Sequence, residues 1–114
     1  MLSKKNRIQN QRLIQKLGRQ GTSFMTTHFI FKFLPSDLPD SKFAIAISKK
    51  IAPKAVSRNK LRRQITESLR HNLPSIPSPV VALIIQKKGT PEKLEYAIID
   101  TEVQIFINQL KENV

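Results

Sequence analysis

The sequence predicts one α+β domain, residues 1–114, in which a sheet of about four strands packs against three helices. Phenylalanines recur at every second position over 29–33, and large apolar residues alternate with alanines over 43–47, a period of two that is typical of strands. Apolar residues recur every three or four positions over 61–69 and 99–110, as in amphipathic helices. A chain of 114 residues suffices for a single hydrophobic core. The expected order is α-β-β-(β)-α-β-α, with a mostly antiparallel central sheet.

The N-terminal segment is basic, and its first nine residues show no hydrophobic periodicity. Residues 1–9 contain three cations and no acid, so we expect a mobile basic arm. Asn10 is a typical helix N-cap, and Leu13 and Leu17 have helical spacing. A short helix is therefore predicted to begin after Asn10 and to stop at Gly18.

Two strands are predicted next. Phe29, Phe31 and Phe33 alternate with other residues and should face the core. Residues 35–41 are rich in turn formers, and the alternation over 42–48 predicts an antiparallel partner strand. The first helix either covers the second face of this pair or covers only part of it, which would leave a groove for single-stranded nucleic acid. That second face carries Ile30, Lys32, Ala44, Ala46 and Ser48.

A basic helix follows, delimited by Pro53 and Pro74. Leu61, Ile65 and Leu69 fall on one side of it and should dock on the sheet. Acids are not placed at i,i+4 from the cations, as they would be on a salt-bridged solvent face, so a polyanion is the simplest partner. A solvated surface helix is the alternative. From 49 to 70 there is one acid, Glu67, against eight cations: Lys49, Lys50, Lys54, Arg58, Lys60, Arg62, Arg63 and Arg70.

The last third of the chain has the features of a scaffold. Three prolines occur between 74 and 79 and predict a linker. Residues 80–86 are mostly β-branched and apolar, which predicts a buried central strand. The helical spacing of Ile99, Val103, Phe106, Ile107 and Leu110 predicts a final helix packed on the sheet.

Charge is distributed unevenly along the chain. The net charge is +12, and residues 1–70 hold 16 of the 20 cations but only three acids. Nucleic acid or an anionic membrane surface is the partner that such a charge indicates. We find no apolar run long enough for a membrane span, no signal-peptide core and no cysteine. We therefore expect a cytoplasmic protein without a membrane partner.

No catalytic group is predicted in this polypeptide. The two histidines, His28 and His71, lie 43 positions apart, and His28 is expected on a strand surface. The eight acids show no repeated spacing that would suggest a metal site. An enzyme acting alone needs an acid, a base or a metal within reach of one another.

The stretch 48–67 carries a longer pattern. Ser48-Lys49-Lys50 precedes Lys54-Ala55-Val56-Ser57-Arg58-Asn59-Lys60-Leu61-Arg62-Arg63, and Glu67 follows. Without a gap, this resembles the signature of the bacterial ribonuclease P protein component, which reads Lys, Val, Arg-Asn-Arg, Lys-Arg and Arg-Glu. Lys60 and Thr66 both stand where that family usually has arginine. Outside 48–67 the resemblance extends over nearly the whole chain but is loose.

The resemblance implies a fold like the second domain of ribosomal protein S5, with a left-handed βαβ crossover. It also implies that an RNA subunit with bound Mg²⁺ cleaves the 5′ leader from precursor tRNA, while the protein binds both RNAs. Ile14, Gly18 and Lys32 replace the aromatic residues of the family's leader groove, so weaker base stacking is expected. The implied RNA-subunit contacts are Lys49, Lys50, Lys54, Arg58, Asn59, Lys60, Arg62 and Arg63; the implied leader-groove residues are Ile14, Ile30, Lys32 and Ser48.

Three other functions are compatible with the charge. A ribosomal or other structural RNA-binding protein of similar fold would have no role in cleavage. A DNA-binding regulator would need a helix before the basic helix, where this sequence predicts a strand. A nuclease acting alone would need the acid and base that the chain lacks, so we expect neither a DNA partner nor a cofactor bound by the protein alone.

Overall fold

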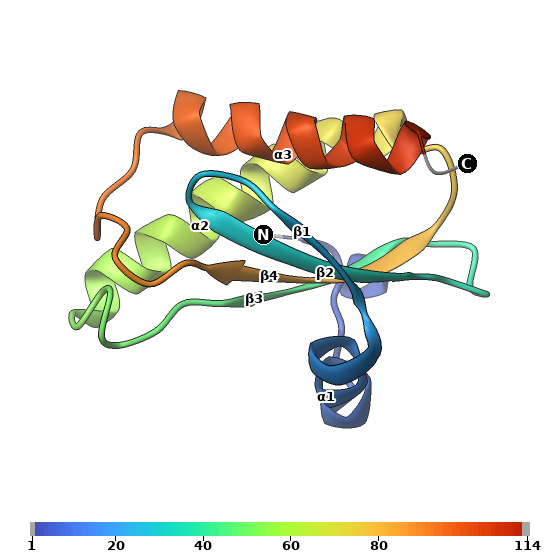
Figure 1. The fold of residues 1–114 in the computed structure, drawn as a ribbon, viewed down its shortest axis with the longest axis horizontal. Coiled ribbons are helices and arrows are strands. Elements are labelled where there is room, and N and C mark those ends of the chain that lie inside the picture. The colour runs from blue at the N-terminus through green and yellow to red at the C-terminus, as the bar shows by residue number, and fades with distance from the viewer. Residues whose placement is uncertain (1, 113–114) are drawn as a thin grey trace.

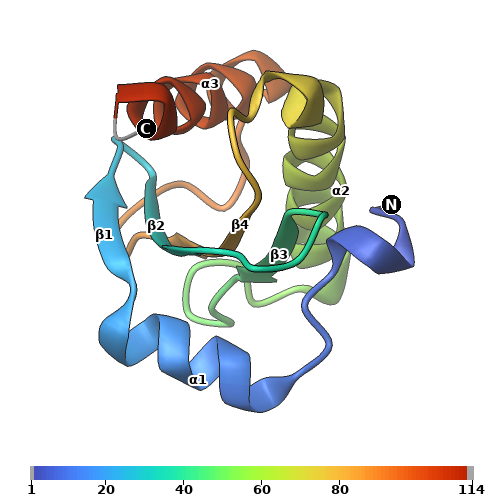
Figure 2. The same ribbon diagram turned by 90° about the vertical axis from the view of Figure 1, so that its right-hand side faces the viewer.

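The computed structural model describes residues 2–112 and has three layers (Figure 1). One helix, α1 (Gln11–Gln20), lies on one face of a four-stranded sheet. The helices α2 (Ala55–Asn72) and α3 (Tyr96–Glu112) cover the other face (Figures 1 and 2). This is the predicted α+β architecture. The strands are β1 (Thr22–Met25), β2 (Phe29–Pro35), β3 (Lys42–Ala46) and β4 (Val80–Gln86), and 3-10 turns span Lys4–Asn6 and Leu73–Ser75.

The strand order is β1-β2-β4-β3. β1 and β4 both pair antiparallel with β2, whereas β3 pairs parallel with β4. The prediction that β3 is the antiparallel partner of β2 is therefore wrong, because β4 lies between them. Six of the seven β4 residues are buried, and a strand that is apolar on both faces is stable only in the middle of the sheet. The loop after β2 crosses the end of β4, where the Ser36 amide donates to the Pro79 carbonyl at 3.0 Å.

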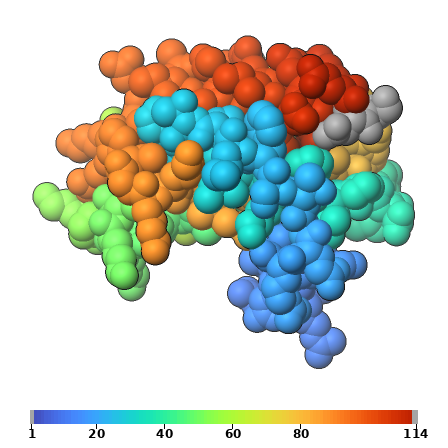
Figure 3. Space-filling model, viewed as in Figure 1, coloured from blue at the N-terminus to red at the C-terminus, as the bar shows by residue number. Residues whose placement is uncertain are grey.

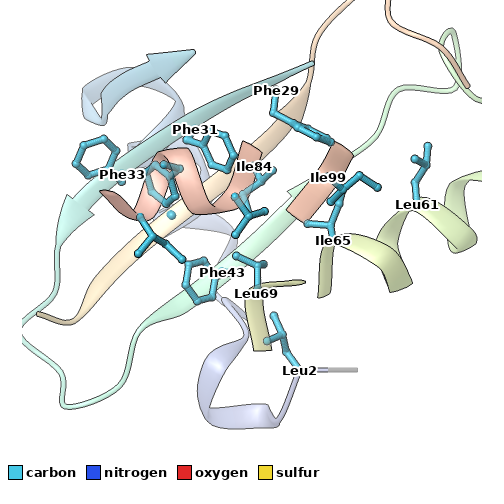
Figure 4. Packing of buried hydrophobic residues seen from close by; sticks show 14 of the residues in the cluster. Leu2, Phe29, Phe31, Phe33, Phe43, Leu61, Ile65, Leu69, Ile84 and Ile99 are labelled. Carbon is cyan, nitrogen blue, oxygen red and sulfur yellow. The ribbon is translucent and has the colours of Figure 1, made fainter. Parts of the chain in front are cut away.

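The main core lies between the sheet and the two long helices (Figure 4). Phe29, Phe31 and Phe33 all point into it, as their alternation predicts. Phe31 stacks on Phe106 of α3 with ring centroids 4.3 Å apart. The apolar stripe of α2 is at most 1% exposed at Leu61, Ile65 and Leu69. Burial of these faces, at about 25 cal/mol per Å² of apolar area, holds α2 and α3 on the sheet.

α1 begins where it was predicted but ends later. The Asn10 side chain accepts a hydrogen bond from the Arg12 amide at 2.9 Å and so caps the helix. The helix continues past Gly18 and stops before Gly21, which is a correction to the predicted end. A Cβ at Gly21 would lie 2.6 Å from the Leu17 carbonyl oxygen of α1 and 3.2 Å from the Phe33 amide nitrogen of β2, whereas one at Gly18 would meet open space. The close approach of helix and sheet therefore requires glycine at position 21, not at 18.

Residues 2–9, for which we predicted a mobile arm, pack along the edge strand β3. Leu2 is buried against the main core, and the Asn6 side-chain amide donates to the Ser41 carbonyl at 2.7 Å. The Ile8 amide donates to the Phe43 carbonyl at 3.0 Å. The arm covers part of a sheet edge that would otherwise present unpaired backbone groups. Its mobility in solution stays a prediction.

One polar contact joins the β1–β2 turn to α3. The backbone amide of His28 donates to Glu102 at 2.7 Å, and the His28 ring contacts the second carboxylate oxygen. The His28 side chain is 19% exposed, so the expectation of a surface residue is wrong. Burial raises the pKa of Glu102, but hydrogen bonds from Thr26 and His28 outweigh it and hold that pKa below its ordinary value.

We predict that this carboxylate makes stability depend on pH. Because the pKa of Glu102 is lower in the folded state, its contribution is complete above about pH 4.5 and is lost as the pH falls. Glu102→Gln should lower the free energy of unfolding by about 1–3 kcal/mol at neutral pH. The variant should also lose less stability than the wild type on acidification. Urea denaturation at a series of pH values measures both effects.

Glu95→Gln is the matched control, because it removes the same charge from an exposed position before α3. Equal stability of Glu102→Gln and Glu95→Gln at every pH would contradict the role assigned to Glu102.

Candidate nucleic-acid interface

The first half of α2 forms a basic surface together with the loop before it. No side chain caps this end of the helix, so its first amide groups carry partial positive charge toward solvent. Such an end favours phosphate. The exposed side chains there include no acid between 48 and 63. The eight predicted RNA-contacting residues all belong to this surface: Lys49, Lys50, Lys54, Arg58, Asn59, Lys60, Arg62 and Arg63.

Arg58 is anchored to the loop that precedes α2. Its Nη1 donates to the carbonyls of Ala52 and Pro53 at 2.9 and 2.8 Å. The Ser48 hydroxyl accepts from the Lys50 amide at 3.0 Å and folds the start of the same loop. Arg58 therefore holds in place the segment that presents Lys49 and Lys50.

Arg62 is anchored to the sheet. Its Nη1 donates to the Ile45 carbonyl of β3 at 3.0 Å. The guanidinium group keeps further N–H donors that can bind phosphate. Asn59, Lys60 and Arg63, in contrast, are exposed on the outer side of the helix. The signature thus separates into two anchored arginines and three outward side chains.

The basic surface ends at the last turns of α2. Arg70 donates to both carboxylate oxygens of Glu67, at 2.7 and 2.9 Å. These hydrogen bonds lower the pKa of Glu67 and raise the pKa of Arg70. The pair cancels its own charge, so the positive field is concentrated toward Lys54.

The sheet face on the α1 side is only partly covered. Leu17 of α1 packs on Val81 and Leu83 of β4 in a second, smaller core. α1 projects from the body of the molecule, as the space-filling view shows (Figure 3). On the same face, four neighbouring side chains, one from each strand, form a row across the sheet and are not fully buried. That row consists of Met25, Ile30, Ile85 and Ala46, which are neighbours in the strand register.

The four predicted leader-groove residues do not form one cluster. Ile30 belongs to the open row, and Ser48 follows the end of β3 just beyond it. Ile14 packs into the smaller core under α1. The Lys32 ammonium donates to the Gly18 carbonyl at 2.7 Å and so holds the helix on the sheet.

Met25 and Ile85 were missed by the sequence analysis. Met25 is 62% exposed at the end of β1, a strand too short to give a clear alternation. Ile85 was assigned to a strand buried on both faces, whereas it is half-buried and is the one residue of β4 that is not fully buried. The basic surface could be predicted from the sequence because its cations are close together along the chain. The open sheet face could not, because its residues become neighbours only when the strands pair.

Two further features bear on the class of protein. Within residues 2–112, no group of three or more His, Cys, Asp or Glu side chains is placed to hold a metal ion. Over the same residues, no helix has the length and apolar character needed to cross a membrane.

Comparisons with known proteins agree with each other. A family model described as Ribonuclease P matches residues 2–111. The ribonuclease P protein component of Rippkaea orientalis is 30% identical over 96% of this chain and 84% of its own length. That of Thermotoga maritima is 28% identical over 96% of this chain and 92% of its own length.

Solved structures show the same fold. The RNase P protein from Thermotoga maritima superposes with a TM-score of 0.81, at 22% identity over 91% of this chain and 96% of its own. The RNase P protein of Staphylococcus aureus gives a TM-score of 0.78, at 21% identity over 92% of this chain and 94% of its own.

We predict that the anchored and the outward arginines respond differently to removal. Arg63→Gln should leave stability unchanged and reduce by about one the slope of log affinity for a structured RNA against log salt concentration. Arg58→Gln should lower the free energy of unfolding by about 1–2 kcal/mol, since two carbonyls lose their charged donor. Urea denaturation and RNA binding at several salt concentrations measure the two effects.

The two variants have the same net charge, so each serves as the control for the other. Identical losses of stability and of salt dependence in both would contradict the distinction between anchored and outward arginines.

Proposed function

Because the chain belongs to the ribonuclease P protein family, we propose that it is the protein component of a ribonucleoprotein that removes the 5′ leader from precursor tRNA, with the chemistry supplied by the RNA subunit. The observation that carries this proposal is the basic face of α2, on which the family signature occupies consecutive turns of one well-packed helix. The ribonuclease P role is also that of the curated relatives.

The RNA subunit is the partner proposed for the α2 face. Arg58 and Arg62 are fixed by backbone carbonyls, so the surface needs little ordering when RNA binds. Lys60 and Arg63 extend outward, where they can neutralise phosphates. Release of counterions from the RNA would supply much of the affinity and make it fall steeply with salt.

The precursor leader is the ligand proposed for the open sheet face. A single strand can lay its bases along the row from Met25 to Ala46, since every base has an apolar face. Lys32 is tied to Gly18, so in this chain it supports α1 rather than offering a stacking surface. The row contains no aromatic ring, and we expect leader binding weaker than the roughly 1–3 kcal/mol per base that aromatic stacking gives.

The chemistry of cleavage is proposed for the RNA and its magnesium ions. Magnesium prefers oxygen ligands, usually carboxylates, in octahedral arrangement. Within residues 2–112 no three His, Cys, Asp or Glu side chains lie together, and no step is assigned to a metal on the protein. The protein's own part is to lower repulsion between two polyanions and to hold substrate and RNA subunit together.

Cleavage of a 5′-extended precursor tRNA by a bacterial ribonuclease P RNA at low magnesium tests this proposal. We expect the protein alone to be inert and the RNA to be stimulated by it. Arg62→Gln/Arg63→Gln should stimulate poorly, because two cations leave the α2 face. Lys88→Gln/Lys111→Gln removes the same charge from exposed positions outside α2 and the loop before it and should stimulate like the wild type.

Tight binding of the RNA without any stimulation of cleavage would instead indicate a structural RNA-binding protein. Cleavage by the protein alone would overturn the assignment of chemistry to the RNA.

A further inference from the structure

The sheet has two edges, β3 and β1, and the chain covers only the first (Figure 2). Along β3, the Phe43 carbonyl accepts from the Ile8 amide and the Ile45 carbonyl accepts from Arg62, both at 3.0 Å. No strand among the described residues pairs with the outer side of β1. Charges, prolines and bulges usually protect an open edge from pairing with another chain. β1 has no charged residue or proline, and its register with β2 is unbroken.

The outward backbone groups of β1 belong to Ser23 and Met25. Beside the turn, the Thr26 amide donates to the Phe29 carbonyl at 2.9 Å. Hydrogen-bonded and non-bonded pairs alternate along an antiparallel ladder, so Phe24 bonds to β2 while Ser23 and Met25 point their backbone groups away from it. Both residues are exposed. Two N–H and two C=O groups therefore face outward at this edge.

These outward groups are arranged symmetrically about Phe24. If a second copy of β1 ran antiparallel with its Phe24 opposite the first, Ser23 of each copy would face Met25 of the other. Each such pair exchanges two N–H···O bonds, so the contact is self-complementary about a two-fold axis. The Phe24 rings, half-buried beside Phe106 at 6.4 Å, would become direct cross-strand neighbours.

The distribution of charge favours the same contact. The chain carries a net charge of +12, so two copies repel each other over most of their surface. Residues 20–31 contain no Lys, Arg, Asp or Glu, and β1 lies within this stretch. The basic helix α2 lies on the β3 side of the sheet, at the edge opposite β1 (Figure 2). Pairing through β1 would therefore leave both α2 faces open to RNA.

We propose that a second copy of this chain docks on β1, antiparallel about Phe24, and extends the sheet to eight strands. This proposal does not depend on the proposed function, because it uses only β1 and its backbone groups. A four-residue strand buries less area than the roughly 1,600 Å² of a standard interface, so the dimer of the free protein is weak. Salt screens the repulsion between the two copies and strengthens their association.

Sedimentation equilibrium from micromolar to millimolar protein, at low and at high salt, tests the association. We expect the dimer fraction to rise with protein concentration and with salt, which is the reverse of the salt dependence of RNA binding. In ¹⁵N NMR spectra over the same concentrations, the amide signals of Ser23 and Met25 should shift, and those of Thr22 and Phe24 should shift less. A monomer at every concentration, or shifts confined to other residues, would overturn the proposal.

Ser23→Pro removes one outward N–H from each copy, and an edge strand tolerates proline where its N–H faces solvent. The dimer loses two hydrogen bonds by symmetry, so association should weaken about tenfold or more. Ser23→Ala is the matched control, because it keeps the N–H and should associate like the wild type. Equal association of the two variants would contradict the proposed pairing. Thermal unfolding checks that Ser23→Pro folds; if it does not, the concentration series of the wild type decides.

Discussion

Strand β4 has apolar side chains on both faces of the sheet, and the rest of the structure depends on covering both of them. On one face, α2 and α3 bury Ala82 and Ile84 completely. On the other, Leu17 of the ten-residue α1 packs in one buried cluster with Val81 and Leu83, while Ile85 stays half-buried at the margin of that cluster. One requirement for burial therefore produces both the core and an open apolar row, because α1 runs across the strands and covers only part of their length (Figures 1 and 2).

The placement of charge follows from the same arrangement. α2 must turn Leu61, Ile65 and Leu69 toward the sheet, so its cations necessarily gather on the opposite side. Their mutual repulsion is a cost to the folded protein that RNA phosphates can offset. Anchoring Arg58 and Arg62 to backbone carbonyls reduces that cost locally and also fixes the surface before RNA arrives. The tight pairing of Arg70 with Glu67 marks where this surface ends.

Features that repeat along the chain could be predicted from the sequence; features that depend on pairing could not. The buried faces of β2, α2 and α3 and the Asn10 cap follow from local spacing and were predicted correctly. The position of β4 between β2 and β3 depends on which strand is apolar on both faces. To predict it, strands that are far apart in the sequence must be compared with one another.

Of the candidate site, the charged residues could be predicted but their contacts could not. The basic helix was found as a charge cluster, but the carbonyl partners of Arg58 and Arg62 and the contact of Lys32 with Gly18 arise only after folding. The His28–Glu102 contact joins residues 74 positions apart, so no short pattern could indicate it. Gly18 was taken as a helix end because glycine often is one, yet the close contact with the sheet falls at Gly21.

In the proposed function, two faces of this small domain bind two different RNAs while α3 binds neither. The chain has no cysteine, so single cysteines carrying a photo-crosslinker can be placed at Lys60 on α2, Ala46 on the open sheet face and Ile105 on α3. In the assembled holoenzyme with precursor tRNA, Lys60→Cys should cross-link to the RNA subunit, Ala46→Cys to the leader, and Ile105→Cys to neither. Cross-linking from Ile105→Cys as strong as from Lys60→Cys, or exchange of the two targets, would contradict the account.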